Sequence, residues 1–410
     1  MHSTINKCFV FFLACWISEA WVPQQQPQQR RSHTSTLAAD TVDARYYSLF
    51  ETPLQTQIQT LPPVTLNRFL QAKVQEQPEL RDLESLYLAV QMACKTISTL
   101  VHRAGLVTPT STPKDSYSDG RYYSMKRLDL LSTLVLKNAL KYTGKCQVVE
   151  PAVRLDSESP ATHQPGVLIA KSLQQEKRSF VAVLDPLDGS GNADASICTG
   201  TVFGVFEQSE QSDEEEALIQ AVLQPARRMR AAGYCLYSSA TVMVVAIGDS
   251  VQGFTLDPQT KEFVLTHPDL TIPSRGNVYS CNEGNSEGWD PAFRQYIQTI
   301  KTGRGQTGQR YAHRYVGSMV GDIHRTLLYG GIFCYPRDNQ DHPNGNLQLL
   351  YKSAPMAYVV EKAGGRALGD ADQSLLDITP ERVHQKYPCF MGSADDVAEL
   401  QEYLRLESSQ

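Results

Sequence analysis

The chain has 410 residues, of which 41% are hydrophobic and 20% are charged, and its formal net charge is −6. This composition is typical of a soluble globular protein with two domains or one large domain. Because the net charge is negative and no run of five basic residues occurs, the sequence excludes a broad electrostatic surface for nucleic acid. We therefore expect no nucleic-acid partner, and we expect an anionic ligand to be a small molecule held in a local pocket.

The first forty residues differ in composition from the rest. Residues 8–17, CFVFFLACWI, form an apolar segment too short to span a bilayer, and the small residues Ser18 and Ala20 follow it, as at a signal-peptide cleavage site. Residues 21–39 contain two Arg, several Ser and Thr, and no acidic residue, which is typical of a transit peptide.

We therefore expect residues 1–40 to be a cleaved bipartite presequence, similar to those of algae with complex plastids. It would deliver the mature chain to the chloroplast stroma, with no membrane association after processing. The alternative is a plain signal peptide for secretion, followed by a spacer.

Seven cysteines follow this presequence, and their number and spacing argue against two kinds of site. The number is odd, the cysteines are far apart in the sequence, and no C-x-x-C pair or Cys/His cluster occurs. The sequence therefore predicts neither a zinc site nor a disulfide framework, and it favours a reducing compartment. These cysteines are Cys94, Cys146, Cys198, Cys235, Cys281, Cys334 and Cys389.

Ordered structure is expected to begin after residues 41–64, which are rich in Gln, Thr and Pro and are interpreted as a linker or arm. From residue 81 to 104, apolar residues recur three and four positions apart and Gly105 follows, which predicts an amphipathic helix. The remaining patterns are a helix at 128–142, apolar runs of strand type at 180–185 and 234–248, an acidic exposed loop at 207–227, and a hairpin at 251–266 turned at Asp257 and Pro258. This mixture of helices and strands predicts an α/β fold.

The strand predicted at 180–185 runs into the segment DPLDGSGN, residues 185–192, which has the residue types of a metal and phosphate site. Asp185 and Asp188 follow a buried strand, and α/β sheets bind their ligands at the carboxyl ends of strands. Carboxylate oxygens are ligands that Mg²⁺ prefers, and the small residues Gly189, Ser190 and Gly191 would let backbone N–H groups approach a phosphate. The alternative is two ordinary turns, Asp-Pro and then Asp-Gly, whose carboxylates bond to their own backbone.

The same segment resembles the D-P-L-D-G-S-S-N signature of the class I fructose-1,6-bisphosphatases, and the strand after it is similar to their G-[TS]-[IV]-F-G motif. Further blocks that resemble the family, in the same order, are AAGYCLYSSAT (231–241), YSCNEG (279–284), RYVGSMVGDIHRTLLYGGIFCYP (314–336), LLYKSAPMAYVVEKAGG (349–365) and MGSADDV (391–397). The resemblance covers roughly residues 66–404. It implies a layered α-β-α-β-α sandwich, the sugar phosphatase fold, with subdomains at 65–265 and 266–406.

The resemblance also implies an activity, the Mg²⁺-dependent hydrolysis of the 1-phosphate of fructose 1,6-bisphosphate. Sedoheptulose bisphosphate is a close alternative substrate that the sequence does not separate. This reaction needs negative charge neutralised and a water activated, which clustered metal ions do together.

The resemblance assigns a role to each site residue. The implied metal ligands are Glu150, Asp185, Asp188 and the carbonyl oxygen of Leu187. The implied catalytic carboxylates are Asp129 and Asp185, with Asp129 helping to activate the water. The implied substrate contacts are Asp188, Gly189, Ser190, Gly191, Asn282, Arg314, Tyr315 and Tyr335. In the family, the arginine at the position of Arg314 reaches across from a neighbouring subunit, so the resemblance implies a homotetramer.

Several positions depart from the family pattern, and they cluster in the expected pocket. The family's paired glutamates, S-E-E, correspond to a segment that offers only Glu150, followed by Pro151. The family's metal-binding glutamate in L-Y-E-x-x-P-M is Lys352 here. The other altered positions are Asn346 and Gln348, which replace the lysine and arginine of N-G-K-L-R, and Asn285, which replaces the tyrosine after N-E-G.

Lys352 is the departure with the largest expected effect, because it puts a positive charge where a dication is expected. Two unit charges about 4 Å apart interact by roughly 4 kcal/mol at an effective dielectric constant of about 20. If the Lys352 ammonium faces the site, it would pair with Asp185 and Asp188; the alternative is a side chain that extends into solvent. Two functions therefore remain: a weakened phosphatase, and a catalytically silent family member that binds sugar phosphate or assembles with an active paralogue.

Overall fold

The computed structural model describes residues 63–106, 117–151, 167–170, 179–208, 215–370 and 373–408. The predicted presequence, residues 1–40, lies outside the described residues, and so does the predicted linker except for residues 63 and 64. Within the described part of the chain, no helix combines the length and apolar character that crossing a membrane requires.

The larger of two main sheets has eight strands in the order β2-β1-β3-β4-β5-β6-β7-β8. Strands β1 and β3 are parallel, whereas the other neighbouring pairs in this sheet are antiparallel. Parallel strands end at the same edge of a sheet, so the ends of β1 and β3 share one edge. The strands are β1 (Cys146–Pro151), β2 (Val167–Ala170), β3 (Ser179–Asp188), β4 (Thr199–Gln208), β5 (Met229–Tyr237), β6 (Thr241–Ile247), β7 (Ser250–Leu256) and β8 (Phe263–His267).

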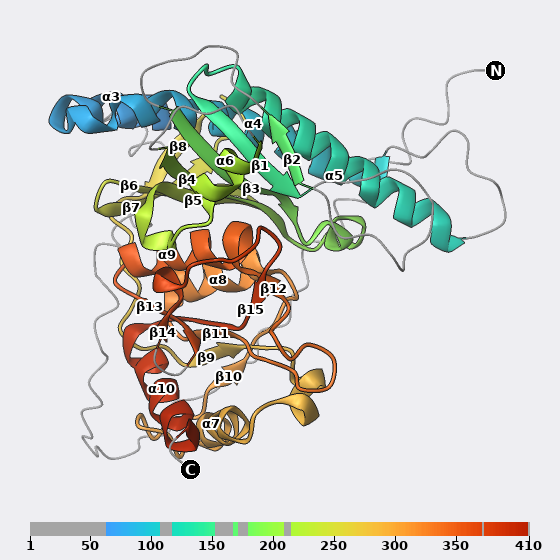
Figure 1. Ribbon diagram of the computed structural model, residues 1–410, viewed down its shortest axis with the longest axis vertical. Helices are drawn as coiled ribbons and strands as arrows, with labels where there is room; N and C mark the ends of the chain where they lie inside the picture. The colour runs from blue at the N-terminus through green and yellow to red at the C-terminus, as the bar shows by residue number, and fades with distance from the viewer. Residues whose placement is uncertain are drawn as a thin grey trace, which may run out of the picture. The chain divides into compact units, whose positions relative to one another are not determined.

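Three helices cover one face of this sheet: α3 (Leu66–Glu76), α4 (Arg81–His102) and α5 (Tyr117–Lys141) (Figure 1). The apolar residues of α4 recur at helical spacing and are buried against the sheet, which confirms the helix predicted at 81–104. The helix predicted at 128–142 begins earlier, at Tyr117. Helix α3 was not predicted, although it starts at a recognisable cap, where the Thr65 hydroxyl accepts a hydrogen bond of 3.4 Å from the backbone N–H of Arg68.

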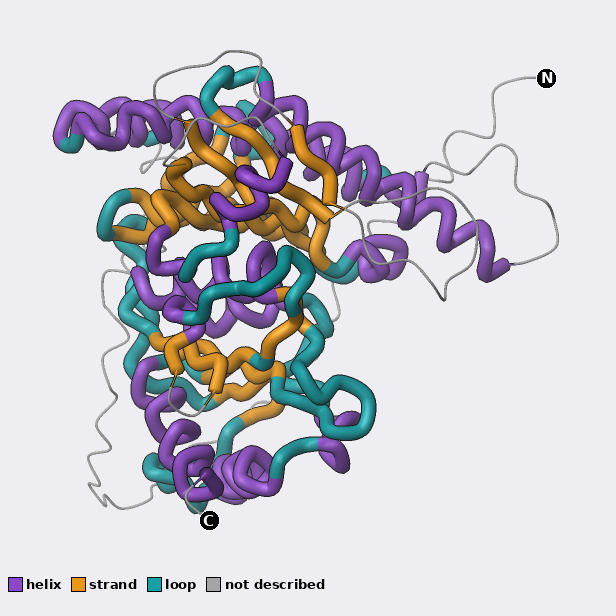
Figure 2. The backbone as a smooth tube through the Cα atoms, in the orientation of Figure 1, coloured by secondary structure: helices purple, strands orange, loops and turns teal. Residues whose placement is uncertain are grey.

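The second main sheet has six strands in the order β10-β9-β11-β16-β13-β14. Helices α8 (Met319–Tyr329) and α9 (Ala354–Lys362) lie between the two sheets, and their apolar residues share one core with both. Helices α7 (Pro291–Thr302) and α10 (Ala394–Ser408) cover the far face of the smaller sheet (Figure 2). The strands are β9 (Val278–Ser280), β10 (Ala312–His313), β11 (Ile332–Tyr335), β13 (Arg366–Asp370), β14 (Gln373–Ser374) and β16 (Cys389–Gly392). These five layers confirm the expected α-β-α-β-α sandwich.

Two local predictions differ from the structure, and a third is confirmed. The apolar run at 234–248 is two strands, β5 and β6, because the chain turns at residues 238–240, where the N–H of Ser238 donates to the carbonyl of Ala240. The segment 207–227 is not only an exposed loop, since it contains α6 (Glu215–Val222), which buries Leu218 and Val222 in the core. The hairpin at 251–266 is confirmed as β7 and β8.

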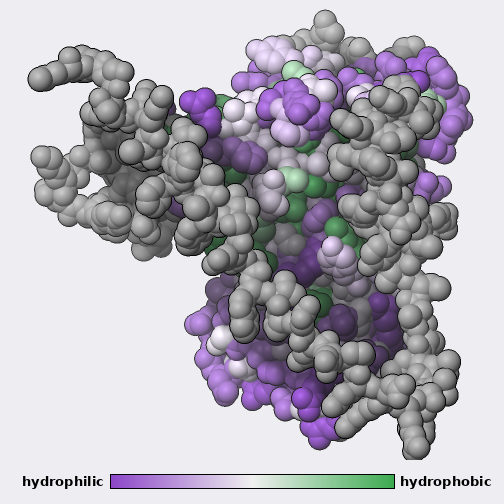
Figure 3. All heavy atoms as spheres, turned by 180° about the vertical axis from the view of Figure 1, so that it is seen from behind, coloured by the Kyte–Doolittle hydropathy of each residue, from purple (hydrophilic) through white to green (hydrophobic). Residues whose placement is uncertain are grey.

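Among the residues that the structure describes, the exposed apolar side chains are scattered and do not form one large patch. Figure 3 shows that hydrophilic side chains cover much of the face that is drawn in colour, with smaller apolar areas among them. The large hydrophobic residues that are exposed in the described part of the chain belong to separate elements and loops; they include Met92 on α4, Tyr329 on α8 and Leu406 on α10. Isolated exposures of this kind are normal for a folded chain.

Candidate active site

The two aspartates of the DPLDGSGN segment lie side by side because β3 contains a bulge. Residues three apart on a regular strand point to opposite faces. Here Asp185 is paired with Val202 and Asp188 with Gly200, so β3 has one residue more than β4 over this stretch. The Thr201 hydroxyl fixes the bulge by donating a hydrogen bond of 2.8 Å to the carbonyl of Pro186. Both carboxylates are therefore directed to the same place.

The chain turns sharply after Asp188, and a glycine makes this turn possible. Gly189 has a φ of +70°, and a Cβ atom there would lie 3.2 Å from Asn192 Nδ2. A short helical segment, η3 (Ser190–Ala195), follows. Asn192 Nδ2 donates a hydrogen bond of 3.2 Å to the carbonyl of Gly317, which joins this turn to the loop before α8.

Lys352 lies in η6 (Leu349–Ser353), a π-helical turn that leads into α9. Its neighbours Leu350 and Tyr351 are buried, and the Ser353 hydroxyl donates to the carbonyl of Gln348 at 3.2 Å, so the turn is held firmly in the core. From there the Lys352 ammonium donates to Asp185 Oδ2 at 2.5 Å and to Asp188 Oδ1 at 2.7 Å. The Lys352 side chain is only 17% exposed. It does not extend into solvent, so the first of the two sequence interpretations is the one observed.

The electrostatics of the site follow from burial and from one cation shared by two anions. Burial by itself lowers the pKa of Lys352, but the Asp185 and Asp188 carboxylates outweigh this effect and hold the pKa above its usual range. Burial raises the pKa of Asp185 to about 6, with Lys352 opposing the rise and Asp188 adding to it. Burial also raises the pKa of Asp129 to about 6, and a hydrogen bond from Ser190 opposes that rise. Asp129, on α5, therefore joins the group predicted from the sequence.

The residues at this site do not fit a divalent metal ion in the observed arrangement. An ammonium lies within hydrogen-bond distance of both aspartates, where a metal would need their lone pairs. Among the described residues, no group of three or more His, Cys, Asp or Glu could hold a metal. One oxygen, Asp188 Oδ2, is buried without a hydrogen-bond partner among those residues, but a single free oxygen is not a metal site. Glu150 and Pro151 end β1, and their side chains lie outside the described part.

The residues predicted to contact the distal end of the substrate lie on the smaller sheet and its loops. Tyr315 is half-buried, and burial raises its pKa to about 12, with smaller contributions from neighbours that include Tyr335 and Asp188. Asn282 is exposed and accepts a hydrogen bond of 3.2 Å from the N–H of Gly284, and its amide donates to Asn285 Oδ1 at 3.2 Å. Arg314 is exposed and donates to the carbonyl of His313 at 2.9 Å.

Two residues that sequence reasoning missed hold the segment from Arg314 to Val316 in place. Asp322 is buried on α8, and both its oxygens accept from the N–H of Val316, at 3.1 and 3.0 Å. Arg325 donates to the carbonyl of Arg314 at 2.8 Å and to Asp322 Oδ1 at 2.7 Å. The signal was available, because an acid and an arginine three residues apart meet on one side of a helix.

The altered positions Asn346 and Gln348 lie at a small two-stranded sheet formed by β12 (Leu347–Gln348) and β15 (Lys386–Tyr387). Asn346 Oδ1 accepts a hydrogen bond of 2.7 Å from the Lys386 ammonium, and Gln348 is paired with Lys386 across the strands. Lys386 therefore brings a positive charge close to the position where the family pattern has its own lysine.

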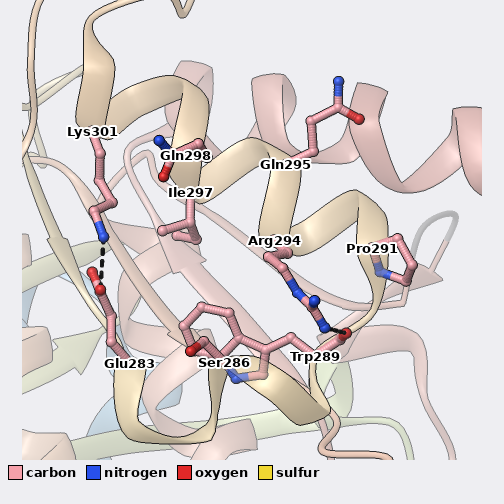
Figure 4. A pocket seen from close by; sticks show the side chains of 9 residues that line it. All are labelled: Glu283, Ser286, Trp289, Pro291, Arg294, Gln295, Ile297, Gln298 and Lys301. Carbon is pink, nitrogen blue, oxygen red and sulfur yellow. Dashed lines mark hydrogen bonds and ion pairs between the residues drawn. The ribbon is translucent and has the colours of Figure 1, made fainter.

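A separate pocket lies beside α7, with a cavity volume of about 460 Å³ (Figure 4). Its lining includes Trp289 and Lys301, and the Lys301 ammonium is paired with Glu283 at 2.8 Å. None of the residues that the sequence predicts for the active site lines this pocket. We therefore place the candidate active site at Asp185, Asp188, Asp129 and Lys352.

Comparison with known proteins gives two family models that together match most of the chain. The model described as the fructose-1,6-bisphosphatase N-terminal domain matches residues 64–268, and the model of the C-terminal domain matches residues 272–405. The first match contains Asp129, Asp185 and Asp188, and the second contains Lys352.

Individual relatives match over nearly the same length. Fructose-1,6-bisphosphatase 1, chloroplastic, of Arabidopsis thaliana is 39% identical over 335 residues, which cover 79% of this chain and 76% of that protein. The cytosolic fructose-1,6-bisphosphatase of the same plant is 39% identical over 338 residues, which cover 82% of this chain and 93% of that protein. Among solved structures, the holo form of Leishmania major fructose-1,6-bisphosphatase matches with a TM-score of 0.70 at 36% identity, covering 83% of this chain and 99% of that one. The chain therefore belongs to the fructose-1,6-bisphosphatase family.

Proposed function

We propose that this chain is a phosphoric monoester hydrolase of the fructose-1,6-bisphosphatase type, which removes the 1-phosphate of fructose 1,6-bisphosphate at a reduced rate. The activity is supported by the relatives, which carry the fructose-1,6-bisphosphatase name and match this chain across both halves. The reduced rate rests on a single observation, the ion pairs from Lys352 to Asp185 and Asp188. Mg²⁺ is the proposed metal, and its binding would require these ion pairs to break.

The proposed residue roles follow the family pattern where the chain retains it. Asp129 and Asp185 are the proposed catalytic carboxylates. Asp188, the Leu187 carbonyl and Glu150 complete the proposed metal ligands. The proposed substrate contacts are Asp188 with the turn at Gly189, Ser190 and Gly191, and Asn282, Arg314, Tyr315 and Tyr335 at the distal end. Because the turn after Asp188 is built around a left-handed glycine, its backbone is suited to close approach by a phosphate.

A catalytically silent protein is the second candidate, and the same lysine favours it. A buried ammonium paired with both carboxylates offsets half of their negative charge, which weakens the attraction for a dication. Such a protein would bind sugar phosphate without turnover, or assemble with an active paralogue. Sedoheptulose bisphosphate stays the alternative substrate for an active protein.

Phosphate release from the purified mature chain, with and without Mg²⁺, tests these candidates. We expect Mg²⁺-dependent release from fructose 1,6-bisphosphate at least about tenfold slower than from the chloroplastic Arabidopsis relative, since each ~1.4 kcal/mol of lost metal affinity costs a factor of ten. Lys352→Glu should raise the rate of phosphate release but leave it below that of the relative, because Asn346, Gln348 and Pro151 are unchanged. Lys362→Glu, whose ion pair is with the exposed Asp249, is the matched control.

Each result of this assay favours one candidate. A rate equal to that of the relative would contradict the proposed weakening. No release from either the wild type or Lys352→Glu, with fructose or sedoheptulose bisphosphate, would favour the silent protein.

We also infer that the mature chain consists of two subdomains that meet near residue 265. The eight-stranded sheet ends at β8, at His267, and every strand of the six-stranded sheet comes later in the chain. The two family models are separated at residues 269–271, which is the same region.

We infer that residues 1–40 direct the chain to a plastid, on the strength of the apolar segment and the basic, acid-free segment after it. The relatives leave both compartments open, since chloroplastic and cytosolic proteins match equally well. A fusion of residues 1–45 to a fluorescent reporter should enter the plastid of an alga with complex plastids. Secretion of the reporter, or its retention in the cytosol, would contradict this inference.

A further inference from the structure

The two site aspartates depend on one cation from another part of the fold. Asp185 and Asp188 are 7% and 6% exposed, so water cannot neutralise their charge. Lys352 is the basic group in every ion pair that these aspartates make within the described residues. Asp129 adds a third carboxylate nearby, because Asp185 and Lys352 both affect its pKa. This centre, formed by Asp129, Asp185, Asp188 and Lys352, thus holds more carboxylates than ammonium groups.

Lys352 has little freedom to leave this position. The turn that carries it is anchored on both sides by buried residues, with Leu349 and Leu350 each 1% exposed and Ser353 fully buried. Its side chain reaches from η6 to β3, so the ion pairs join the layer between the sheets to the edge of the larger sheet. Moving the ammonium into solvent would leave two buried carboxylates without a counter-charge, which is strongly unfavourable.

From this geometry we infer that the Lys352 ammonium takes the place of a divalent metal between Asp185 and Asp188 and supplies one of the two positive charges that the metal would provide. Asp185 and Asp188 then keep their ion pairs with Lys352 when no metal is bound. This inference goes beyond the proposed function, because it concerns how the site is stabilised rather than how fast it turns over substrate. The inference is based on a difference in charge: this chain has a lysine where the family pattern has a metal-binding glutamate.

The inference predicts that metal will stabilise the protein only when Lys352 is removed. Thermal unfolding of the full chain without substrate is compared at 0 and 10 mM MgCl₂ for the wild type, Lys352→Met and Lys352→Glu. The wild-type midpoint should not shift with Mg²⁺. Lys352→Met should unfold several degrees lower without metal, because both carboxylates lose their partner. Lys352→Glu should be lowest without metal, and Mg²⁺ should raise its midpoint by about 2 °C or more, as mass action requires for a bound cation.

A surface lysine and a second probe serve as controls. Lys362→Met removes an ion pair whose carboxylate, Asp249, has a 99% exposed side chain, and it should behave as the wild type does. If Lys352→Glu does not fold, a binding measurement replaces the unfolding comparison. Electron paramagnetic resonance then measures the binding of Mn²⁺ alone to the wild type and to Lys352→Gln. The wild type should bind Mn²⁺ at least tenfold more weakly than Lys352→Gln.

Two results would overturn the inference. One is a wild-type midpoint that rises with Mg²⁺ as much as that of Lys352→Glu. The other is a Lys352→Met midpoint equal to that of the wild type with and without metal. Rapid turnover by a wild type whose midpoint ignores Mg²⁺ would contradict only the proposed weakening, so the two failures are distinguishable.

Discussion

Among the altered positions, Lys352 differs from the others in the sign of its charge and in its burial. Asn346, Gln348 and Asn285 replace family residues with neutral amides, so each removes at most one attraction. Lys352 turns an attraction for a dication into a repulsion, and its side chain is 17% exposed, so solvent screens it weakly. A charge reversal of this kind, at about 4 Å and an effective dielectric constant of about 20, amounts to several kcal/mol.

A second single residue, His324 on α8, makes stability depend on pH. Burial lowers its pKa to about 4, with His267 adding to the fall, and its Nδ1 is hydrogen-bonded to the Tyr234 hydroxyl at 2.8 Å. Below pH ~6.5 the unfolded chain binds a proton there that the folded chain does not bind until about pH 4. The stabilising contribution of neutral His324 is therefore complete above pH ~6.5 and is lost as the pH falls toward 4. It amounts to roughly 1–3 kcal/mol.

Denaturant unfolding of the wild type and of His324→Gln between pH 7.5 and 4 measures this contribution. The glutamine keeps a polar group near Tyr234 but does not titrate, so the difference in free energy of unfolding between the two proteins should shrink as the pH is lowered. Other groups, such as the buried carboxylates, titrate in both proteins and cancel in the difference. A difference that stays constant over this range would show that His324 is not buried in its neutral form.

At the scale of elements, the segments that could be predicted from the sequence are those with local causes. Helix α4 and the β7–β8 hairpin carry their periodicity or turn residues within themselves. The split of residues 234–248 into β5 and β6 escaped prediction because two serines and an alanine form the turn at 238–240, without Gly or Pro. Helix α6 was not predicted because acidic residues precede it and because Leu218 and Val222 are buried through contacts with the rest of the fold, not within the helix itself.

The residues of the candidate site could also be predicted only where their pattern is local in the sequence. Asp185, Asp188 and the small residues after them are adjacent in sequence, so their pattern alone indicated an anion or metal site. Asp129 and Lys352 come from α5 and η6, and the family resemblance, not spacing, pointed to them. The direction of the Lys352 side chain depends on a π-helical turn and on a bulge in β3, which single-sequence patterns do not reveal. Asp322 and Arg325 were missed because their role is to hold backbone.

At the scale of the whole molecule, two exposed aliphatic residues lie in the loops beside the distal end of the site. Val316 and Ile197 are 41% and 40% exposed. The hydrogen bond from Asn192 to the carbonyl of Gly317 ties together the two loops that carry them. Arg314, two residues before Val316, is exposed, and its guanidinium donates to the carbonyl of the adjacent residue His313. An exposed arginine beside exposed aliphatic residues is typical of a protein interface.

We therefore expect the mature chain to form a homotetramer through this region, and to do so without metal, since Lys352 already pairs with both site aspartates. Light scattering after size exclusion, at micromolar concentration and with EDTA, should give the mass of four chains. Val316→Asp should reduce the mass by placing a carboxylate in the apolar contact. Leu406→Asp, at a residue on α10 that is 68% exposed, is the matched control and should leave the mass unchanged. A wild-type monomer, or an equal effect of the two substitutions, would mean that the Arg314 region is an ordinary surface.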